Sequence, residues 1–580
     1  MDRPNPKEER KKKVYEVITF PVPFTLEVIK ENITINTNTA SKPFKEQRIH
    51  KAFDSYLKAI QTNPTNSKNY ILITRLLRDS DLSHLSKSNL KNILNILLER
   101  NDVPHKELAN VFNFLYSGEI ISILQKLDSD FSKIKLLLND KVIINAFKKI
   151  IFCNLELEKL LTKVRRNMCD YISRNIETIN YLELQFITAL GEQCFLNDYV
   201  YSSTEEENMC LNTIIERCRD GQLSEINISI LSCYFPLYKL LDQIPSLKFI
   251  NSSNKSFKEL IELQIKEPIQ EIELSNDIKK LGTINDNISQ KVKVQYEENP
   301  FPRWRYANYS KSLKISFTSQ INNDIKPNYI NQTLQDGQLK VLIAGCGTGK
   351  QILEAQKYEN SKITAIDISL SSISYAKRKM NELGINNVEL IQMDILKVNL
   401  LEEEFDIILC SGVLHHMDNP SEGLRMLFKV LKNNGFLKLG LYSELGRKDI
   451  VKARNYFINK KIQSNEENIR NFRQEVIGSK LNYLNSLKTI SDFYSLSEFR
   501  DLCVHTQEHR FTINQLQETL TSNKLNFLGF LLPKPIKSKY EDYFPEDRKQ
   551  TNLQNWAKFE EKHPTTFLSM YQFWVSKTEN

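Results

Sequence analysis

Apolar residues recur at three- and four-residue spacing along most of the first half of the chain. The stretches NLKNILNILLER, EIISILQKL, VIINAFKKIIF and LELEKLLTKVRRNM show this pattern between residues 43 and 266, and few glycines interrupt it. Such spacing puts the apolar side chains on one face of a helix. We therefore predict an all-helical domain over residues 43–266 and interpret most of its apolar faces as packing surfaces.

One stretch of this region has the further pattern of a tetratricopeptide repeat. HKAFDSYLKAIQTNPTNSKNY places Ala52, Tyr56, Ala59 and Pro64 at the small, aromatic, small and helix-ending positions of that repeat. The rest of the region does not return at the repeat's period of about 34 residues. We predict one tetratricopeptide-like repeat within an irregular helical domain, which is also the part of the chain that a protein partner would bind.

Two polar segments flank this domain. Residues 1–42 are rich in Lys and then in Asn and Thr, with little periodic apolar pattern, and we predict a flexible leader there. Residues 267–291 are polar and rich in Asn and Asp, which indicates a linker.

The pattern changes over residues 292–580. Short apolar runs, namely LKVLIAG, KITAID, VELIQMD, FDIILCS and FLKLGLY, alternate with amphipathic helical stretches. This alternation predicts a parallel sheet covered by helices on both faces. A helical insertion at about 445–510 follows, then a helix, the strand NFLGFLL and a last strand within FLSMYQFWVSK. We predict an α/β domain that carries a helical cap.

Composition and charge narrow the class of protein. A chain of 580 residues is too long to fold around a single hydrophobic core, so we expect more than one domain. Its net charge of +8 permits an anionic partner without requiring one. The nine cysteines form no CxxC pair, which favours reduced thiols. No stretch approaches the roughly twenty apolar residues that span a bilayer. We expect a soluble cytoplasmic protein with no membrane partner.

The segment VLIAGCGTG carries the candidate chemistry. A strand leads into Gly345, Gly347 and Gly349, and glycines there let the chain turn tightly and let a ligand approach its backbone. The next strand ends at Asp367, about twenty residues further on, where a carboxylate can accept both ribose hydroxyls. The third strand ends at Asp394, which suits an adenine amino group between apolar neighbours. The order of these groups predicts a nucleoside-binding crevice.

These motifs resemble those of the class I S-adenosylmethionine-dependent methyltransferases, in particular bacterial proteins that fuse tetratricopeptide-like helices to this module. The resemblance covers about residues 290–580. It implies a Rossmann-like, seven-stranded sheet whose last strand, FLSMYQFWV, is antiparallel, and S-adenosyl-L-methionine as cofactor. The resemblance, the residues at the strand ends and the segment 295–305 described below together give the candidate cofactor-binding residues. These are Tyr296, Arg303, Gly345, Cys346, Gly347, Gly349, Asp367, Ile368, Met393, Asp394, Ile395 and Ser411.

One position departs from the family pattern. Ile343 stands two residues before the first glycine, where the family usually has an acid that faces the cofactor's ammonium group. Backbone carbonyls after the fourth strand could accept those protons instead. The competing class of dinucleotide dehydrogenases is disfavoured because Lys350 occupies the third glycine position of their motif. A phosphate-binding Walker loop is absent, since no GKS or GKT follows.

The segment 295–305, QYEENPFPRWR, precedes this core and resembles one found in the same bacterial fusion proteins. Its prolines keep it extended while aromatic and cationic side chains project from it. We interpret it as a lid in which Tyr296, Arg303 and Trp304 close over the cofactor, with Arg303 paired to the methionine carboxylate. The alternative is a linker that its aromatic residues fix to the domain.

Histidines supply the candidate catalytic groups. The fourth strand, FDIILCSGVLHHM, delivers His415 and His416 to the carboxyl edge of the sheet, where ligands bind in such folds. An imidazole titrates near neutral pH, so either residue could act as a general base. His505 and His509, four residues apart in the cap, could share a helical face and bind a metal ion. No further ligand cluster is evident nearby, and we therefore expect no metal site.

The methyl acceptor is open at this stage. The segment after the fourth strand, Ser411 to Leu414, lacks the prolines and the stacking ring of enzymes that methylate base amines. We therefore expect a small-molecule or protein acceptor and disfavour nucleic acid. Two alternatives remain: a helical interaction or scaffold protein with a degenerate cofactor module, and an RNA methyltransferase that uses the basic segment from Lys448 to Arg473.

Overall fold

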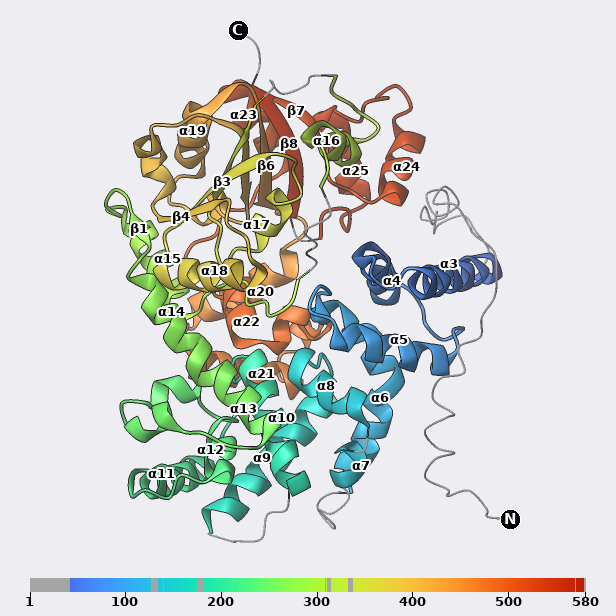
Figure 1. The fold of residues 1–580 in the computed structure, drawn as a ribbon. Coiled ribbons are helices and arrows are strands. Elements are labelled where there is room, and N and C mark those ends of the chain that lie inside the picture. The colour runs from blue at the N-terminus through green and yellow to red at the C-terminus, as the bar shows by residue number, and fades with distance from the viewer. Residues whose placement is uncertain are drawn as a thin grey trace.

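The computed structural model describes residues 42–126, 134–138, 140–174, 181–307, 309, 314–331, 337–568 and 570–577. The leader predicted at 1–42 lies outside these residues except for its last position. Helices form the first part of the chain, as predicted, and an α/β sheet domain follows them (Figure 1). Among the described residues, no helix combines the length and the apolar character needed to cross a bilayer.

The N-terminal domain is an irregular packing of helices. Asn, Ser, Asp or Thr side chains cap many of them, and apolar faces meet in one buried cluster. Its helices are α3 (Lys42–Thr62), α4 (Ser67–Asp79), α5 (Lys87–Glu99), α6 (Ala109–Leu124), α7 (Ile134–Leu138), α8 (Lys141–Lys149), α9 (Leu155–Ser173), α10 (Tyr181–Leu196), α11 (Glu205–Arg219), α12 (Glu225–Leu231) and α13 (Lys255–Ile261). Short 3-10 turns lie between them: η1 (His105–Leu108), η3 (Leu237–Leu240) and η4 (Pro245–Phe249).

The predicted tetratricopeptide-like repeat falls on the pair α3 and α4. Tyr56 is buried, and the Tyr70 hydroxyl donates to the Pro64 carbonyl oxygen at 3.0 Å, which fixes the turn between the two helices. The amide of Asn69 donates to the Ala59 carbonyl oxygen at 3.2 Å. The helical hairpin is present, and its assignment to that repeat family stays a prediction.

The segment 267–291 differs from the predicted linker. A π-helical turn, η5 (Glu262–Lys266), continues α13 into α14 (Glu267–Ser275), and α15 (Asn287–Glu298) follows. Arg378 of the sheet domain pairs with Glu267 at 3.1 Å and with Glu271 at 2.7 Å. The polar residues that indicated a linker therefore face another part of the chain, and α14 packs against α18 (Leu370–Leu383).

An eight-stranded sheet forms the core of the second domain, in the order β1-β4-β3-β2-β5-β6-β8-β7. β2 to β6 are parallel neighbours, and β8 runs antiparallel between β6 and β7, as the resemblance implied. The eighth strand, beyond the seven expected, is the two-residue β1, which pairs with the edge strand β4. The strands are β1 (Lys279–Lys280), β2 (Leu339–Ala344), β3 (Ser361–Asp367), β4 (Val388–Gln392), β5 (Phe405–Ser411), β6 (Leu431–Tyr442), β7 (Leu525–Phe530) and β8 (Met570–Lys577).

Helices cover both faces of this sheet, and each face has its own buried cluster. One face packs against α16 (Phe317–Ile325), α17 (Lys350–Ala355) and α18. The other packs against η6 (Ile395–Leu401), α19 (Pro420–Val430), α23 (Ile513–Ser522), α24 (Lys534–Tyr543) and α25 (Leu553–Lys562). The Rossmann-like fold predicted from the strand and helix pattern is confirmed.

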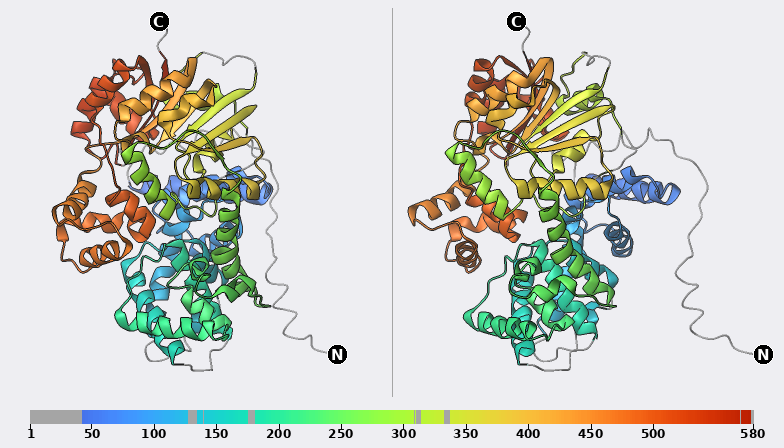
Figure 2. Two further views of the ribbon diagram at one scale, coloured as in Figure 1. Left: turned by 90° about the vertical axis from the view of Figure 1, so that its left-hand side faces the viewer. Right: turned by 60° about the vertical axis from the view of Figure 1, so that its left-hand side comes forward.

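The cap shares its core with the N-terminal helices rather than with the sheet. It consists of α20 (Lys448–Asn459), α21 (Glu466–Ile477), η8 (Asn482–Thr489), η9 (Ser491–Tyr494) and α22 (Leu496–Cys503). Phe457, Phe472 and Phe499 belong to the same buried cluster as Leu97 and Leu190. Figure 2 shows the cap, in orange, against the teal helices below the sheet. The cap and the helical domain thus form one layer that faces one end of the sheet.

Candidate active site

The glycine loop follows β2 and has the backbone that only glycine adopts readily. Gly345, Gly347 and Gly349 have φ angles of +77°, +49° and +88°, in the left-handed region. A Cβ atom on Gly345 would lie 2.4 Å from Val413, and one on Gly347 would lie 2.6 Å from the Phe301 carbonyl oxygen. The first two glycines therefore serve close packing as well as backbone conformation.

Asp367, at the end of β3, is tied to this loop. Its carboxylate accepts hydrogen bonds from the backbone N–H of Gly347 at 2.7 Å and of Ser369 at 2.9 Å. Burial is the largest cause that raises the pKa of Asp367, to about 6, and the nearby Glu297 carboxylate adds to it. Each carboxylate oxygen keeps a lone pair free, so the group can still accept hydrogen bonds from sugar hydroxyls.

Asp394 follows β4 and caps the turn η6, where its carboxylate accepts from the Leu396 N–H at 2.9 Å. Its neighbours Met393 and Ile395 are buried. Because β3 and β4 are adjacent and parallel, their carboxyl ends meet at one edge, and both acids line the same cavity as the glycine loop. The crevice predicted from the strand ends is present.

A cavity of about 1360 Å³ opens at this edge between the sheet and the helical layer. Of the twelve candidate cofactor-binding residues, Gly349 alone does not line it. The helical domain contributes Lys106, Lys149 and Phe195 to the opposite wall of this cavity. The cap contributes Asp492 and Glu498 to another wall. The site is thus built by all three parts of the chain.

Ile343 is fully buried in the core between the sheet and α17. This position therefore offers no negative charge to a cofactor ammonium group, unlike the acid that the family usually has there. Ser411, the last residue of β5, lines the cavity as a candidate cofactor contact. Its carbonyl oxygen already accepts a hydrogen bond from the Gln351 side chain at 2.9 Å. A second lone pair on this oxygen is still free to accept from a cofactor ammonium group.

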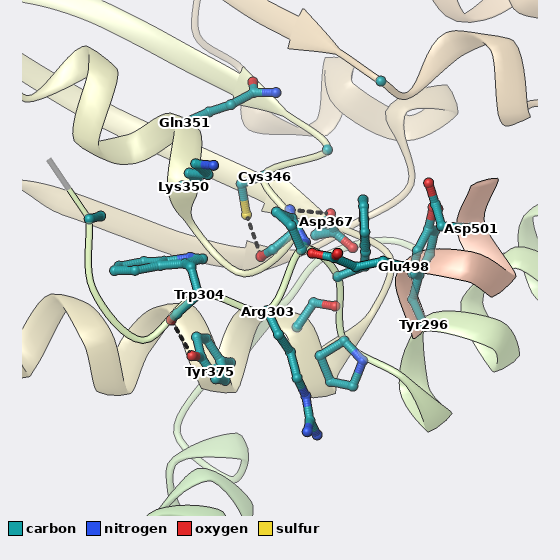
Figure 3. A pocket seen from close by; sticks show the side chains of 18 of the residues that line it. Tyr296, Arg303, Trp304, Cys346, Lys350, Gln351, Asp367, Tyr375, Glu498 and Asp501 are labelled. Atoms are coloured by element: carbon teal, nitrogen blue, oxygen red, sulfur yellow. Dashed lines mark hydrogen bonds between the residues drawn. The ribbon is translucent and has the colours of Figure 1, made fainter. Parts of the chain in front are cut away.

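The segment 295–305 is fixed against the glycine loop. The Phe301 carbonyl oxygen accepts from the Thr348 N–H at 3.3 Å, and the Trp304 indole N–H donates to the Thr348 carbonyl oxygen at 3.1 Å. The Tyr375 hydroxyl donates in turn to the Trp304 carbonyl oxygen (Figure 3). These contacts favour the alternative interpretation, a segment that its aromatic residues fix to the domain. Closure of the segment over a cofactor stays a prediction.

Arg303 is placed differently from the expectation that it pairs with the methionine carboxylate. Its guanidinium donates to the Asp198 carboxylate of the helical domain at 2.9 Å and lies over the Phe195 ring. Figure 3 shows the side chain pointing away from Asp367. Arg303 thus forms its ion pair with an acid of the helical domain. We therefore revise its assignment from a contact with the cofactor to a link between the two domains.

The two candidate histidines have different surroundings. His415 is completely buried, stacks on the Tyr442 ring at 3.7 Å, has no hydrogen bond to either ring nitrogen and does not line the cavity. His416 lines the cavity, and its Nδ1 lies 2.7 Å from the Gln507 carbonyl oxygen. Burial lowers the pKa of His415 well below the usual value and that of His416 to about 4, so both rings are neutral at pH 7.

Comparison with known proteins agrees with this geometry. Residues 335–513 match the family model described as "Methyltransferase domain". Residues 335–513 therefore form a methyltransferase domain, as the resemblance to S-adenosylmethionine-dependent enzymes implied. The glycine loop, Asp367 and Asp394 around one cavity fit that cofactor, as the resemblance implied.

Similar proteins cover parts of the chain. An uncharacterized protein of Synechococcus is 29% identical over 42% of this chain and 60% of its own length. A malonyl-[acyl-carrier protein] O-methyltransferase of Priestia megaterium is 26% identical over 37% of this chain and 72% of its own. The structure of PKMT2 from Rickettsia typhi in complex with AdoHcy covers 45% of this chain and 53% of its own, at 20% identity and a TM-score of 0.37.

Glu297 and Asp501 are two of the cavity acids that sequence reasoning missed. Glu297 of α15 accepts from the backbone N–H groups of Leu370 and Ser371, at 2.7 and 2.9 Å, and so holds the start of α18 beside Asp367. Asp501 of α22 accepts from the Tyr296 hydroxyl at 2.6 Å. Both lie in segments singled out from the sequence, but no local pattern marks an acid whose partner is far along the chain.

The cap histidines are also arranged differently from the expectation. α22 ends at Cys503, so His505 and His509 lie in an extended segment rather than on one helical face. The imidazole of His505 stacks on that of His416 at 3.6 Å. His509 instead contacts the Asp418 carbonyl oxygen at 3.1 Å. His505 and His509 therefore do not share a helical face.

Proposed function

We propose that this chain transfers the methyl group of S-adenosylmethionine to an acceptor bound between the sheet domain and the helical layer. The observation that carries the proposal is the shared cavity of about 1360 Å³. Its volume exceeds the roughly 300–1,000 Å³ of common small-molecule sites. A nucleoside cofactor at the glycine loop therefore leaves room for a second molecule, or for a side chain of a protein, against the helical side.

The residues of the chain act mainly by holding and enclosing the reactants. The bound cofactor supplies a methyl group that its sulfonium already makes electrophilic. Gly345 and Gly347 leave room at the loop, while Asp367 and Asp394 would accept hydrogen bonds from the ribose hydroxyls and from the adenine amino group. The helical layer lines one side of the cavity. Positioning of the acceptor between this layer and the sheet would supply much of the acceleration of a displacement reaction.

His416 is the histidine that we propose to face the acceptor. It lies at the carboxyl end of β5 and lines the cavity, whereas His415 is enclosed by Tyr442 and His416. The contact of His416 Nδ1 with the Gln507 carbonyl oxygen assigns the ring proton to Nδ1. The lone pair at Nε2 is then available to accept a proton from an acceptor hydroxyl or amine.

A small-molecule or protein acceptor remains the proposal. In the segment from Lys448 to Arg473, which the RNA alternative would use, several arginines are engaged in packing: Arg473 with Glu158, Arg470 with the Tyr199 carbonyl oxygen and Arg454 with the His505 carbonyl oxygen. Cations held in this way are not displayed to a phosphate backbone. A protein partner of the helical domain likewise stays a prediction.

Calorimetry with S-adenosylmethionine and S-adenosylhomocysteine tests the proposal and separates an enzyme from a scaffold. We expect both ligands to bind the full chain and Asp367→Asn to weaken both. Asp449→Asn, a surface change at a residue paired with Lys452, is the matched control and should leave both affinities unchanged. Absence of binding by the wild-type chain would favour the scaffold alternative.

A further inference from the structure

Tyr442, the last residue of β6, brings a phenol to the cavity that nothing in the proposed reaction uses. Only 7% of the residue is exposed, and it lines the cavity beside His416, with the two ring centroids 5.5 Å apart. Among the described residues, none forms a hydrogen bond with its hydroxyl. The Tyr358 hydroxyl also lacks a partner there, but it is fully enclosed and lies away from the cavity. Of these two hydroxyls, only that of Tyr442 can be reached by a bound molecule.

Both faces of the Tyr442 ring are covered. The His415 ring stacks on it with 3.7 Å between centroids and 23° between planes, and the guanidinium carbon of Arg447 lies 3.7 Å from the same centroid. Non-bonded carbon atoms approach to about 3.5–4.0 Å, so two groups this close to one centroid cannot share a face. The ring therefore offers a ligand only its edge and its hydroxyl.

The two flanking groups are themselves held in place. His415 is completely buried and has no hydrogen bond to either ring nitrogen, so it serves as a stacking surface. Arg447 donates to the Glu508 carboxylate at 2.8 Å and to the Leu502 carbonyl oxygen at 2.6 Å. The phenol is thus fixed before a ligand arrives, and a fixed hydrogen-bonding group loses little conformational freedom on binding.

The Tyr442 hydroxyl keeps its proton at neutral pH. Burial raises the pKa of Tyr442 above its ordinary value of 10.0, and the Asp501 carboxylate acts in the same direction while Arg447 opposes it. The phenol is therefore a hydrogen-bond donor and not a base. Its neighbour His416 carries its proton on Nδ1 and presents a lone pair at Nε2. A donor and a proton acceptor thus lie on adjacent side chains of the cavity wall.

A fixed donor at this place distinguishes oxygen from nitrogen as the atom that is methylated. A hydroxyl oxygen has two lone pairs, so it can accept from Tyr442 with one and attack the methyl group with the other. A neutral amine nitrogen has a single lone pair, and a hydrogen bond from Tyr442 would occupy the electrons that the attack needs. An ammonium group has no lone pair and cannot accept at all.

We propose that Tyr442 donates a hydrogen bond to the methyl acceptor and thereby selects an alcohol or phenol hydroxyl as the group that is methylated. This inference rests on the proposed function. In the transfer, the acceptor oxygen bonds to the methyl carbon, and the bond between that carbon and sulfur breaks with its electron pair left on sulfur. The hydroxyl proton moves to His416 Nε2, and Tyr442 keeps its own proton throughout.

The kind of bond that forms is the first test. The full chain is incubated with S-adenosylmethionine that carries ¹³C in its methyl group and with an extract of the source cells from which its gene has been deleted. ¹³C NMR separates methyl groups on oxygen from those on nitrogen by chemical shift. Among the signals that appear only when the chain is added, we expect methoxy groups.

Tyr442→Phe is the second test, because it removes the hydroxyl and keeps the stacked ring. We expect the initial rate of methoxy formation to fall by roughly five- to tenfold, as for the loss of one hydrogen bond. The share of methyl groups on nitrogen should rise, which a merely structural role would not produce. Tm and the affinities for S-adenosylmethionine and S-adenosylhomocysteine should stay unchanged.

Tyr358→Phe is the matched control, because it removes a partnerless hydroxyl that lies outside the cavity. It should methylate at the wild-type rate. Methyl groups on nitrogen alone would overturn the inference and leave the proposed function standing. An unchanged rate in Tyr442→Phe would do the same, and so would a loss of cofactor affinity, since that would place the hydroxyl at the cofactor. A wild-type chain that binds the cofactor but transfers no label would overturn the proposed function and this inference with it.

Discussion

Arg473 of α21 and Glu158 of α9 form a completely enclosed ion pair that joins the cap to the N-terminal helices. The guanidinium donates two bonds to the carboxylate, at 3.1 and 3.0 Å, and further bonds to the carbonyl oxygens of Phe493 and Val200. Arg473 is 0% exposed and Glu158 is 4% exposed. The pair fixes the layer that closes the cavity.

Removal of one partner should therefore destabilise the chain strongly. Glu158→Ala leaves the guanidinium buried without its counter-charge, a change that costs about 3–5 kcal/mol in comparable pairs. Denaturant unfolding measures the loss. The control is Glu466→Ala, which removes an exposed partner of Arg470 and should cost less than about 1 kcal/mol. Similar losses in both variants would contradict the role of the buried pair.

Gly347→Ala should damage the cofactor site. The new Cβ would lie 2.6 Å from a carbonyl oxygen and would force a left-handed backbone that costs alanine about 1–3 kcal/mol. We expect loss of measurable S-adenosylmethionine binding and a lower Tm. Gly221→Ala is the control, because Gly221 has φ of +91° but no atom within 4 Å of the new Cβ. It isolates the backbone cost and should leave cofactor affinity unchanged.

Cofactor affinity should depend on pH through Asp367. Burial raises the pKa of this carboxyl to about 6, above its ordinary value of 3.8. The raised pKa means that ionisation costs stability, so the contribution of Asp367 to folding is greatest below pH 3.8 and falls as pH rises to 6. Ribose hydroxyls prefer the ionised form, so affinity should change in the opposite direction.

We therefore expect S-adenosylmethionine binding to weaken as pH falls below 6, by up to about tenfold per pH unit. Calorimetry between pH 5 and 8 measures it. Asp367→Asn cannot ionise and should flatten the profile. A wild-type profile without curvature near pH 6 would refute the link.

Arg303→Ala should act on the contact between domains rather than on the cofactor directly. Arg303 binds Asp198, whose other carboxylate oxygen accepts from Ser495 at 2.9 Å and from Ser497. Arg303→Ala and Asp198→Asn should each cost about 1 kcal/mol of unfolding free energy. The double variant should cost less than their sum, because both remove one interaction. A large loss of cofactor affinity for Arg303→Ala alone would restore the original assignment.

The two neighbouring histidines should respond differently to substitution. His415→Phe keeps the stack on Tyr442 and removes ring nitrogens that have no hydrogen bonds, so turnover should remain within about threefold. His416→Phe should lower turnover by at least about 100-fold, the lower range for loss of acid–base catalysis. Methylation assays with an identified acceptor measure both. Equal effects would contradict the distinction between the two sites.

Much of the sheet domain was predictable because its signals are local. The strand–glycine–helix sequence around Gly345, and the acids at the ends of β3 and β4, lie within short stretches whose geometry follows from strand alternation and backbone conformation. The linker prediction at 267–291 did not anticipate the helix at 267–275, because polarity alone cannot separate a loop from a helix whose charged face meets Arg378. The eighth strand has two residues and no pattern of its own.

The sequence by itself determined most of the strands and helices of the sheet core, the glycine loop and the two acids at the neighbouring strand ends, since short-range periodicity and turn chemistry encode them. Only the tertiary structure decided that Arg303 binds Asp198, that the cap shares its core with the N-terminal helices and that His416 and Asp501 meet His505. Those contacts join residues that lie far apart along the chain; Tyr296 and His505, for example, are 209 positions apart. Their choice of partner depends on how whole layers pack and bury charge.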